Sequence, residues 1–177
     1  DALSSEYVKL IAELSKLDNE IIIQIDEPIF VTDRAAELAS KIVPIYDSLA
    51  SVADNVKIIF MTYFEHANEA VAQVVKSKIW AIGLDFVHAA CQEEALKLLS
   101  NSDKVLFAGL IDGRNVWVSN LDAKAEIASK IKTFIPDERL YIGTSCSLLH
   151  VPYTLKYEEN LSIKEWLAFG VEKLTEL

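Results

Sequence analysis

The chain has few of the residues on which disulfide-stapled and nucleotide-binding proteins depend. Among its 177 residues there are two cysteines, five glycines and one methionine. The two cysteines, Cys91 and Cys146, are too few to form the framework of a small secreted domain, so we expect free thiols and a cytoplasmic setting. The glycines form neither a G-x-G-x-x-G nor a G-x-x-x-x-G-K-[ST] motif, which excludes a dinucleotide fingerprint and a P-loop.

Basic residues and long apolar runs are also scarce. Lysine and arginine number 17 against 27 acidic residues, which gives a net charge of −10 and excludes nucleic acid as a partner on electrostatic grounds. No apolar run approaches the ~18 residues of a membrane-spanning helix, and no signal-peptide pattern opens the chain, so we expect no membrane partner. The first residue is Asp1, so we expect the chain to belong to a longer polypeptide.

Hydrophobic residues are plentiful at 51%, enough for a large core. They form five short runs, which are nearly continuous rather than alternating, as in parallel strands that are covered on both faces. Amphipathic segments of helical period separate the runs, so the chain reads as an α/β protein with a parallel sheet. The predicted strands are 21–25, 56–61, 79–84, 105–110 and 140–143. The predicted helices are 6–17, 34–52, 68–75, 92–99, 123–134 and 163–177.

Polar side chains follow the predicted strands, at the ends where parallel α/β folds bind ligands. All three histidines of the chain, His66, His88 and His150, lie at these ends. The recurrence over five strands predicts one real or vestigial site face, although each residue alone could simply serve a polar loop or cap a helix. The candidate site residues are Asp26, Glu27, Tyr63, Glu65, Asp85, Asp112, Arg114, Asn115, Cys146 and His150.

Residue types at these ends limit the chemistry. No strand end carries the lysine of a Schiff-base aldolase. Cysteine, histidine and aspartate are legitimate zinc ligands, but the chain has neither C-x-x-C nor H-x-x-x-H, so a buried thiol at Cys146 is favoured over a metal ligand. Glu27 and Glu65 follow neighbouring strands and could act as the acid and the nucleophile of a retaining glycosidase, although few aromatic residues are placed to stack on a sugar.

Four motifs give a family resemblance. The segments QIDEP at 24–28, MTYFE at 61–65, GLIDGRNVW at 109–117 and SCSLLH at 145–150 resemble, in this order, the N-terminal half of cobalamin-independent methionine synthases. Members of that family consist of two (βα)8 barrels. The resemblance implies a partial (βα)8 TIM-type barrel with about five parallel strands and flanking helices. Residues 1–177 would be a single unit that contains strands four to eight of the N-terminal barrel.

The resemblance also implies an activity for the parent enzyme. Such enzymes transfer a methyl group from 5-methyltetrahydrofolate polyglutamate to homocysteine, whose thiolate is activated by zinc in the C-terminal barrel. The zinc ligands there are a histidine, a cysteine, a glutamate and a second cysteine. The matching positions here are Phe60, Thr62, Asp85 and Cys146, so the resemblance implies that this segment binds no metal or other cofactor and is inactive in isolation.

Partners follow from the same resemblance. The N-terminal barrel of the family supports the catalytic barrel and helps to hold the folate tail, with Arg114 as the nearest candidate cation unless it pairs with Asp112. Asp26 matches a position that contacts the homocysteine amino group in the catalytic barrel. The remaining barrel strands and the catalytic barrel would complete the enzyme. The alternative is a free-standing half-barrel, a binding or scaffold module that self-associates through its unpaired sheet edges and uncovered inner face.

Overall fold

The protein is described here by a computed structural model, which covers residues 2–17, 19–89 and 92–177. Cys91 lies outside the described residues, whereas Cys146 is a free, buried thiol. No helix in the described ranges is long and apolar enough to cross a lipid bilayer.

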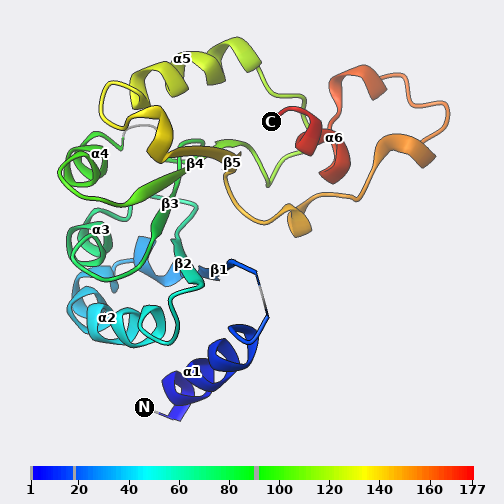
Figure 1. Ribbon diagram of the computed structural model, residues 1–177. Helices are drawn as coiled ribbons and strands as arrows, with labels where there is room; N and C mark the ends of the chain where they lie inside the picture. Colours follow the sequence, from blue (N-terminus) through cyan, green and yellow to red (C-terminus); the bar gives the residue numbers. More distant parts are fainter. Residues whose placement is uncertain (1, 18, 90–91) are drawn as a thin grey trace.

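Five parallel strands form one sheet in the order of the sequence, β1-β2-β3-β4-β5 (Figure 1). Each crossover therefore leads to the adjacent strand, which is the progression of a (βα) barrel and not of a doubly wound sheet. Among the described residues, β1 and β5 each pair with a strand on one side only. The predicted partial barrel of five parallel strands is confirmed. The strands are β1 (Ile21–Asp26), β2 (Val56–Met61), β3 (Ala81–Asp85), β4 (Val105–Ile111) and β5 (Leu140–Thr144).

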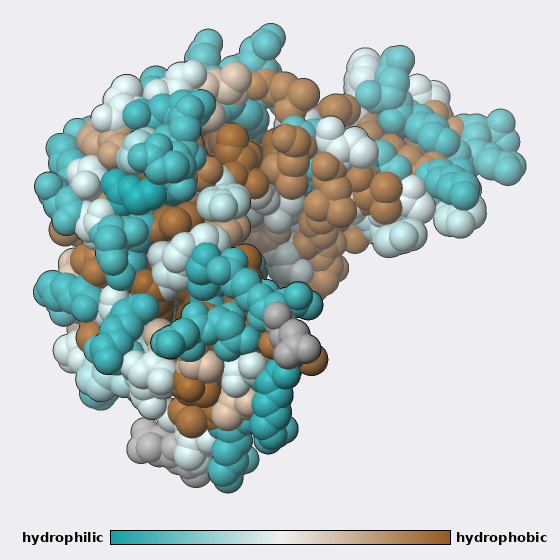
Figure 2. All heavy atoms as spheres, in the orientation of Figure 1, coloured by the Kyte–Doolittle hydropathy of each residue, from teal (hydrophilic) through white to brown (hydrophobic). Residues whose placement is uncertain are grey.

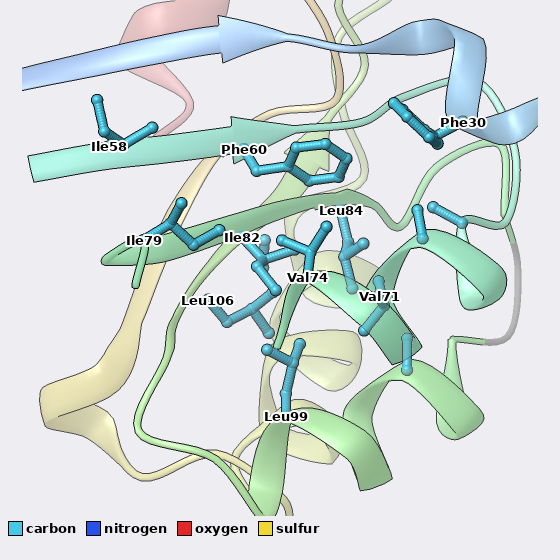
Figure 3. Close-up of a cluster of buried hydrophobic side chains, with 14 of the residues drawn as sticks. Phe30, Ile58, Phe60, Val71, Val74, Ile79, Ile82, Leu84, Leu99 and Leu106 are labelled. Atoms are coloured by element: carbon cyan, nitrogen blue, oxygen red, sulfur yellow. The ribbon is translucent and has the colours of Figure 1, made fainter. Parts of the chain in front are cut away.

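Helices α2 to α5 lie along one face of the sheet, which we call the outer face (Figure 1). Apolar side chains of the strands and helices meet there in one continuous core (Figure 3). Phe60 is at its centre, fully buried, with its ring 5.3 Å from the Tyr46 ring and 5.6 Å from the Phe30 ring. The helices are α1 (Ala2–Leu14), α2 (Ala35–Ala50), α3 (Asn68–Val74), α4 (Glu93–Ser100), α5 (Leu121–Ile131) and α6 (Gly170–Thr175).

The opposite face of the sheet, the inner face, is only partly covered. Because side chains alternate along a strand, β1 turns Ile22 to this face, where it is 51% exposed. Trp80, Phe107 and Tyr141 form an aromatic layer across three neighbouring chain segments, and the Phe107 and Tyr141 rings stack at 4.9 Å. Lys57 places its Nζ 4.9 Å from the centre of the Trp80 ring. Tyr141 nevertheless remains 48% exposed.

The predicted helix at 163–177 is wrong over its first half. Residues 166–168 pair with the segment after β4: the Val118 N–H donates to the Trp166 carbonyl and the Ala168 N–H to the Val116 carbonyl. This antiparallel contact takes the backbone out of the helical region, so α6 begins only at Gly170. Apolar atoms gather where this C-terminal segment meets the sheet (Figure 2), and Leu174 and Leu177 of that segment are more than half exposed.

Candidate functional site

A cleft of about 350 Å³ opens at the carboxyl ends of the strands. Three predicted site residues, Asp26, Tyr63 and Cys146, contribute to its lining. The Tyr63 hydroxyl donates to Asp26 Oδ2 at 3.2 Å, and Gln24 Nε2 donates to Asp26 Oδ1 at 2.7 Å. Partial burial, together with the charge of Asp26, raises the pKa of Tyr63 to about 12. The phenol is therefore a hydrogen-bond donor at neutral pH, and Asp26 is its acceptor.

Asp85 is fully buried at the end of β3, and its carboxylate is saturated by donors from nearby loops. Oδ1 accepts the backbone N–H groups of Val87 and His88 at 2.7 and 2.9 Å. Oδ2 accepts the Phe64 N–H at 2.9 Å and lies 2.8 Å from His88 Nδ1. Because an ionised carboxylate only accepts, this contact assigns the proton of a neutral His88 ring to Nδ1. Asp85 thus organises two loops rather than facing an open site.

Phe64 is the centre of a second group of side chains, which we call the Phe64 cluster: Phe64, His88, Arg114 and His150. Phe64 has φ 89°, a left-handed backbone conformation that is rare for a large residue. The Arg114 guanidinium carbon lies 4.4 Å from the centre of its ring. The His88 and His150 rings lie 6.1 and 5.9 Å from it, at steep angles. Four separate strand ends thus contribute one residue each.

The Asp112 loop is closed on itself. Asp112 Oδ1 accepts the backbone N–H groups of Arg114 and Asn115, and its Oδ2 accepts the Asn115 side-chain amide at 2.5 Å. Asn115 Oδ1 in turn accepts the Trp117 N–H. Asp112 therefore contacts the backbone of Arg114, whereas the Arg114 guanidinium lies over Phe64. The sequence left open an ion pair between the side chains of Asp112 and Arg114. No such ion pair forms within the described residues.

Cys146 lies against the same loop, buried at the end of β5. A Cβ on Gly113 would come 2.9 Å from its Sγ, so only glycine allows this close approach. Burial is the main cause that raises the pKa of the Cys146 thiol, and the charges of Asp85 and Asp112 add to it. The thiol is therefore a poor nucleophile at neutral pH.

Glu27 and Glu65 have different surroundings. Glu27 accepts the Tyr46 hydroxyl of α2 at 2.9 Å, and burial raises the pKa of its carboxyl group, with the neighbouring Asp26 charge adding to the shift. Glu65 and His66 instead line an acidic groove of about 700 Å³ beside α2, α3 and α4, which Glu27 does not line.

The residues at the strand ends do not fit the zinc site of the family. Within the described ranges, no three His, Cys, Asp or Glu side chains are grouped so that they could share a metal ion. Phe60 is a core residue, and Thr62 is buried with its hydroxyl donating to the Gly83 carbonyl at 3.1 Å. A tetrahedral zinc site needs four ligands, and the four matching positions here offer only the side chains of Asp85 and Cys146 as ligands.

Sequence reasoning missed three residues that shape this surface. Gln24 and Tyr46 hold Asp26 and Glu27, and Phe64 connects the loops of its cluster. The strand period placed Gln24 on the same face as Asp26, which was a usable signal. The contact of Tyr46 spans 19 residues and the left-handed backbone of Phe64 depends on Asp85, so neither is visible in the local sequence.

Comparison with known proteins identifies similar sequences over nearly the whole chain. Residues 1–136 match the family model for the N-terminal domain of the cobalamin-independent synthase. A 5-methyltetrahydropteroyltriglutamate–homocysteine methyltransferase of Desulforamulus reducens is 42% identical over 97% of this chain and 22% of its own length. The enzyme of the same name from Halalkalibacterium halodurans is 40% identical over 97% of this chain and 23% of its own length. The chain thus spans less than a quarter of each of these relatives.

The comparison of structures agrees on the fold. A solved structure of a B12-independent methionine synthase from Shewanella sp. W3-18-1, in complex with selenomethionine, matches with a TM-score of 0.68 and 19% sequence identity. The match covers 83% of this chain and 48% of the other chain. At this identity it supports the barrel architecture and nothing finer.

Proposed function

Because the chain belongs to the N-terminal domain family of cobalamin-independent synthases, we propose that it is a supporting part of such a methionine synthase. In this proposal the whole enzyme transfers a methyl group from 5-methyltetrahydrofolate polyglutamate to homocysteine. The segment itself binds no zinc, supports the catalytic barrel and helps to bind the folate tail. The observation that carries the proposal is the 42% identity to a methyltransferase over 97% of the chain.

The geometry at the strand ends favours a structural role for this segment over a catalytic role. Asp26, Asp85 and Asp112 each accept hydrogen bonds from neighbouring residues, so these carboxylates serve the local structure. The Cys146 thiol is buried and its pKa is raised. In this proposal zinc and homocysteine are bound by another part of the enzyme. We assign the folate tail to Arg114, whose guanidinium lies over the Phe64 ring and forms no ion pair with Asp112.

The inner face supports the proposal that other barrel strands complete the sheet. Ile22 and Tyr141 are about half exposed there, at the two ends of the sheet. In a closed barrel such side chains fill the interior in layers. Trp80, Phe107 and Tyr141 would form part of one such layer.

Measurement of methionine formation tests the proposal. The longer synthase that contains this segment, supplied with zinc, homocysteine and 5-methyltetrahydrofolate triglutamate, is expected to form methionine. The 177-residue chain alone is expected to form none under the same conditions. Turnover by the chain alone would contradict the supporting role, and an inactive longer protein that is folded and zinc-loaded would contradict the proposed activity.

A second candidate function is a self-associating half-barrel, which the same exposed inner face and the one-sided pairing of β1 and β5 favour. In this case the chain is expected to form dimers in sedimentation equilibrium, and Tyr141→Asp is expected to dissociate them. A monodisperse monomer across the concentration range would count against this candidate.

A further inference from the structure

We propose that a cleft at the amino ends of the strands, which we call the lysine cleft, binds a small phosphate-bearing molecule. The cleft has a volume of about 630 Å³ and lies where β2, β3 and β4 begin, at the opposite edge of the sheet from the candidate site. Clefts of this size hold small molecules in many proteins. The proposal goes beyond the proposed function, which assigns nothing to this edge. The charged residues that line the cleft are Lys57, Lys76, Lys78, Asp103 and Lys104.

Positive charge is concentrated in this cleft although the chain as a whole is acidic. Four lysines and one aspartate line it, whereas the complete chain has 27 acidic and 17 basic residues. The lysines come from three separate segments: the start of β2, the segment between α3 and β3, and the position directly before β4. Ammonium groups that converge in this way repel one another, and a multivalent anion among them relieves the repulsion.

Lys76 and Lys78 have no carboxylate that neutralises them. Lys76 Nζ donates to Gln73 Oε1 at 3.3 Å, and Lys78 Nζ donates to Ser51 Oγ at 3.1 Å, so both bind neutral acceptors. Neither lysine forms an ion pair within the described ranges. Both lysines are exposed, so their ammonium groups are accessible to a ligand from solution.

Lys57 and Lys104 are held in place by partners of their own. Lys57 Nζ lies 2.7 Å from Glu20 Oε2 and 4.9 Å from the centre of the Trp80 ring. The side chain of Lys104 is buried, and its Nζ lies 2.7 Å from Oδ1 of Asp103, whose own side chain is 84% exposed. Ion pairs with exposed carboxylates contribute little to stability. Exchange of the Asp103 carboxylate for a bound phosphate therefore costs little.

The type of cation favours phosphate over carboxylate. The described residues that line the cleft include no arginine, whose planar fork matches a carboxylate. Lysine is a compact point charge with three donors, which suits the oxygens of a phosphate. An extended polyanion such as nucleic acid would also meet the acidic surface of a chain with a net charge of −10. The cleft therefore suits a compact molecule with several phosphate charges.

Helix dipoles account for only part of this arrangement. Helices α2 and α3 end beside the cleft, and cations are favourable near the C-terminus of a helix. Lys76 and Lys78 follow the end of α3 and could serve that end alone. Lys57 and Lys104 lie at the starts of strands, where the backbone has only a small dipole. The convergence of both pairs on one cleft therefore points to an external anion.

Nuclear magnetic resonance of the three tryptophan indole N–H groups tests the cleft in the 177-residue chain. The probe is inorganic triphosphate, titrated at constant ionic strength because salt screens exposed charges. We expect a saturable shift of the Trp80 signal, which Trp80→Phe assigns, because Trp80 lines the cleft. Trp117 and Trp166 belong to the antiparallel contact near the C-terminus and serve as internal controls that should not shift.

Further ligands distinguish the possible sources of the phosphate groups. ATP and fructose 1,6-bisphosphate present phosphates on a nucleoside and on a sugar. Affinities similar to that of triphosphate would show that the cleft recognises phosphate alone, and tighter binding of one compound would add its carrier to the recognised chemistry. Tri-L-glutamate has carboxylates only and should bind at least about tenfold more weakly. Equal or tighter binding of tri-L-glutamate would contradict the assignment to phosphate.

Two double variants locate the contact. Lys76→Gln combined with Lys78→Gln is expected to weaken triphosphate binding by at least about tenfold, because two charge-assisted contacts are lost. Lys41→Gln combined with Lys97→Gln is the matched control, since it removes the same charge from α2 and α4, where each lysine pairs with a glutamate of its own helix. The control should retain the wild-type affinity to within about twofold. All four positions carry exposed side chains, and circular dichroism checks that each variant is folded.

Three results would overturn the inference: no saturable shift of the Trp80 signal, equal shifts at all three tryptophans, or equal losses of affinity in the two double variants. In the first case the lysines serve only the helix ends and the surface. Failure of this inference is distinguishable from failure of the proposed function, because methionine formation is measured on the longer protein and is not assigned to this edge of the sheet.

Discussion

The two faces of the sheet differ in how completely this chain covers them. On the outer face, Ile58, Phe60, Ile82 and Leu106 are fully buried beneath the helices, in one continuous core. On the inner face, the buried cluster is limited to Ile59, Ala81 and Val105, with three larger side chains packed against it. The chain's own helices bury most of the strand side chains on the outer face, whereas the chain covers its inner face only in part.

Because of this difference, we expect the outer face to contribute most of the folding stability and the inner face to contribute less. Burial of apolar area drives folding at about 25 cal/mol per Å², and most of that burial is between the strands and helices α2 to α5. The inner face and the strand ends contribute less to the core. They carry the aromatic layer, the cleft and the Phe64 cluster.

The largest expected effect is on the outer core. Phe60→Ala should lower the free energy of unfolding by about 3 to 5 kcal/mol, because it leaves a cavity among fully buried side chains. Phe107→Ala on the inner face is the matched control and should cost less than half as much in the isolated chain, because Phe107 is only partly buried. Urea unfolding followed by circular dichroism measures both. Equal losses of stability would contradict the claim that the outer face contributes more to the core than the inner face.

In the proposed longer synthase, we expect the inner face to respond differently. Tyr141→Asp is expected to lower the stability of the whole protein by roughly 2 to 4 kcal/mol, because barrel closure would bury an unpaired charge. Ser40→Asp on the exposed side of α2 is the control and should stay within about 0.5 kcal/mol. If Tyr141→Asp is as well tolerated as Ser40→Asp, the inner face is not covered in the longer protein.

A pair of glycines tests how closely β4 and β5 approach. Gly109 and Gly143 are register partners, yet a Cβ on Gly109 would come 2.7 Å from the Ser145 Cα, whereas one on Gly143 meets nothing within 4 Å. Gly109→Ala should therefore cost about 1 to 3 kcal/mol, and Gly143→Ala should be neutral or slightly stabilising. Thermal unfolding of both variants decides this, and equal midpoints would contradict the close approach of the Ser145 backbone to Gly109.

The smallest effect concerns pH. The raised pKa of Glu27 means that the folded state binds a proton more tightly than the unfolded chain. The protonated carboxyl group therefore contributes its whole stabilisation below the ordinary glutamate pKa of 4.5. This contribution is lost as the pH rises through the higher pKa of Glu27 in the folded state. Glu27→Gln should remove this contribution to the pH dependence, whereas Glu65→Gln, at an exposed position, should leave it unchanged. An identical pH profile for wild type and Glu27→Gln would contradict the assignment.

The sequence predicted the strands better than the contacts between loops. The continuous apolar runs placed all five strands to within two residues, because buried parallel strands need such runs. The helix predicted at 163–177 failed over its first half, because the pairing of Trp166 and Ala168 with the segment after β4 is a tertiary contact that outweighs local helical period.

For the candidate site, the sequence predicted which residues lie at the strand ends. It did not predict which of their side chains contact one another. Asp26, Tyr63 and Cys146 do line one cleft. Asp85 was predicted as a site residue, but its carboxylate is saturated by backbone donors that no sequence pattern reveals. The position of Arg114 over Phe64 likewise depends on the left-handed backbone of Phe64, which residue type alone would argue against.

Hydrogen–deuterium exchange of the edge strands tests most directly whether this chain is a barrel part. The backbone amides of β1 and β5 are compared between the isolated 177-residue chain and the proposed longer synthase. We expect the amides at the unpaired edges to exchange readily in the isolated chain and to become protected in the synthase, because the other barrel strands pair with them. Equal exchange in both proteins would contradict the claim that the rest of the enzyme completes this barrel.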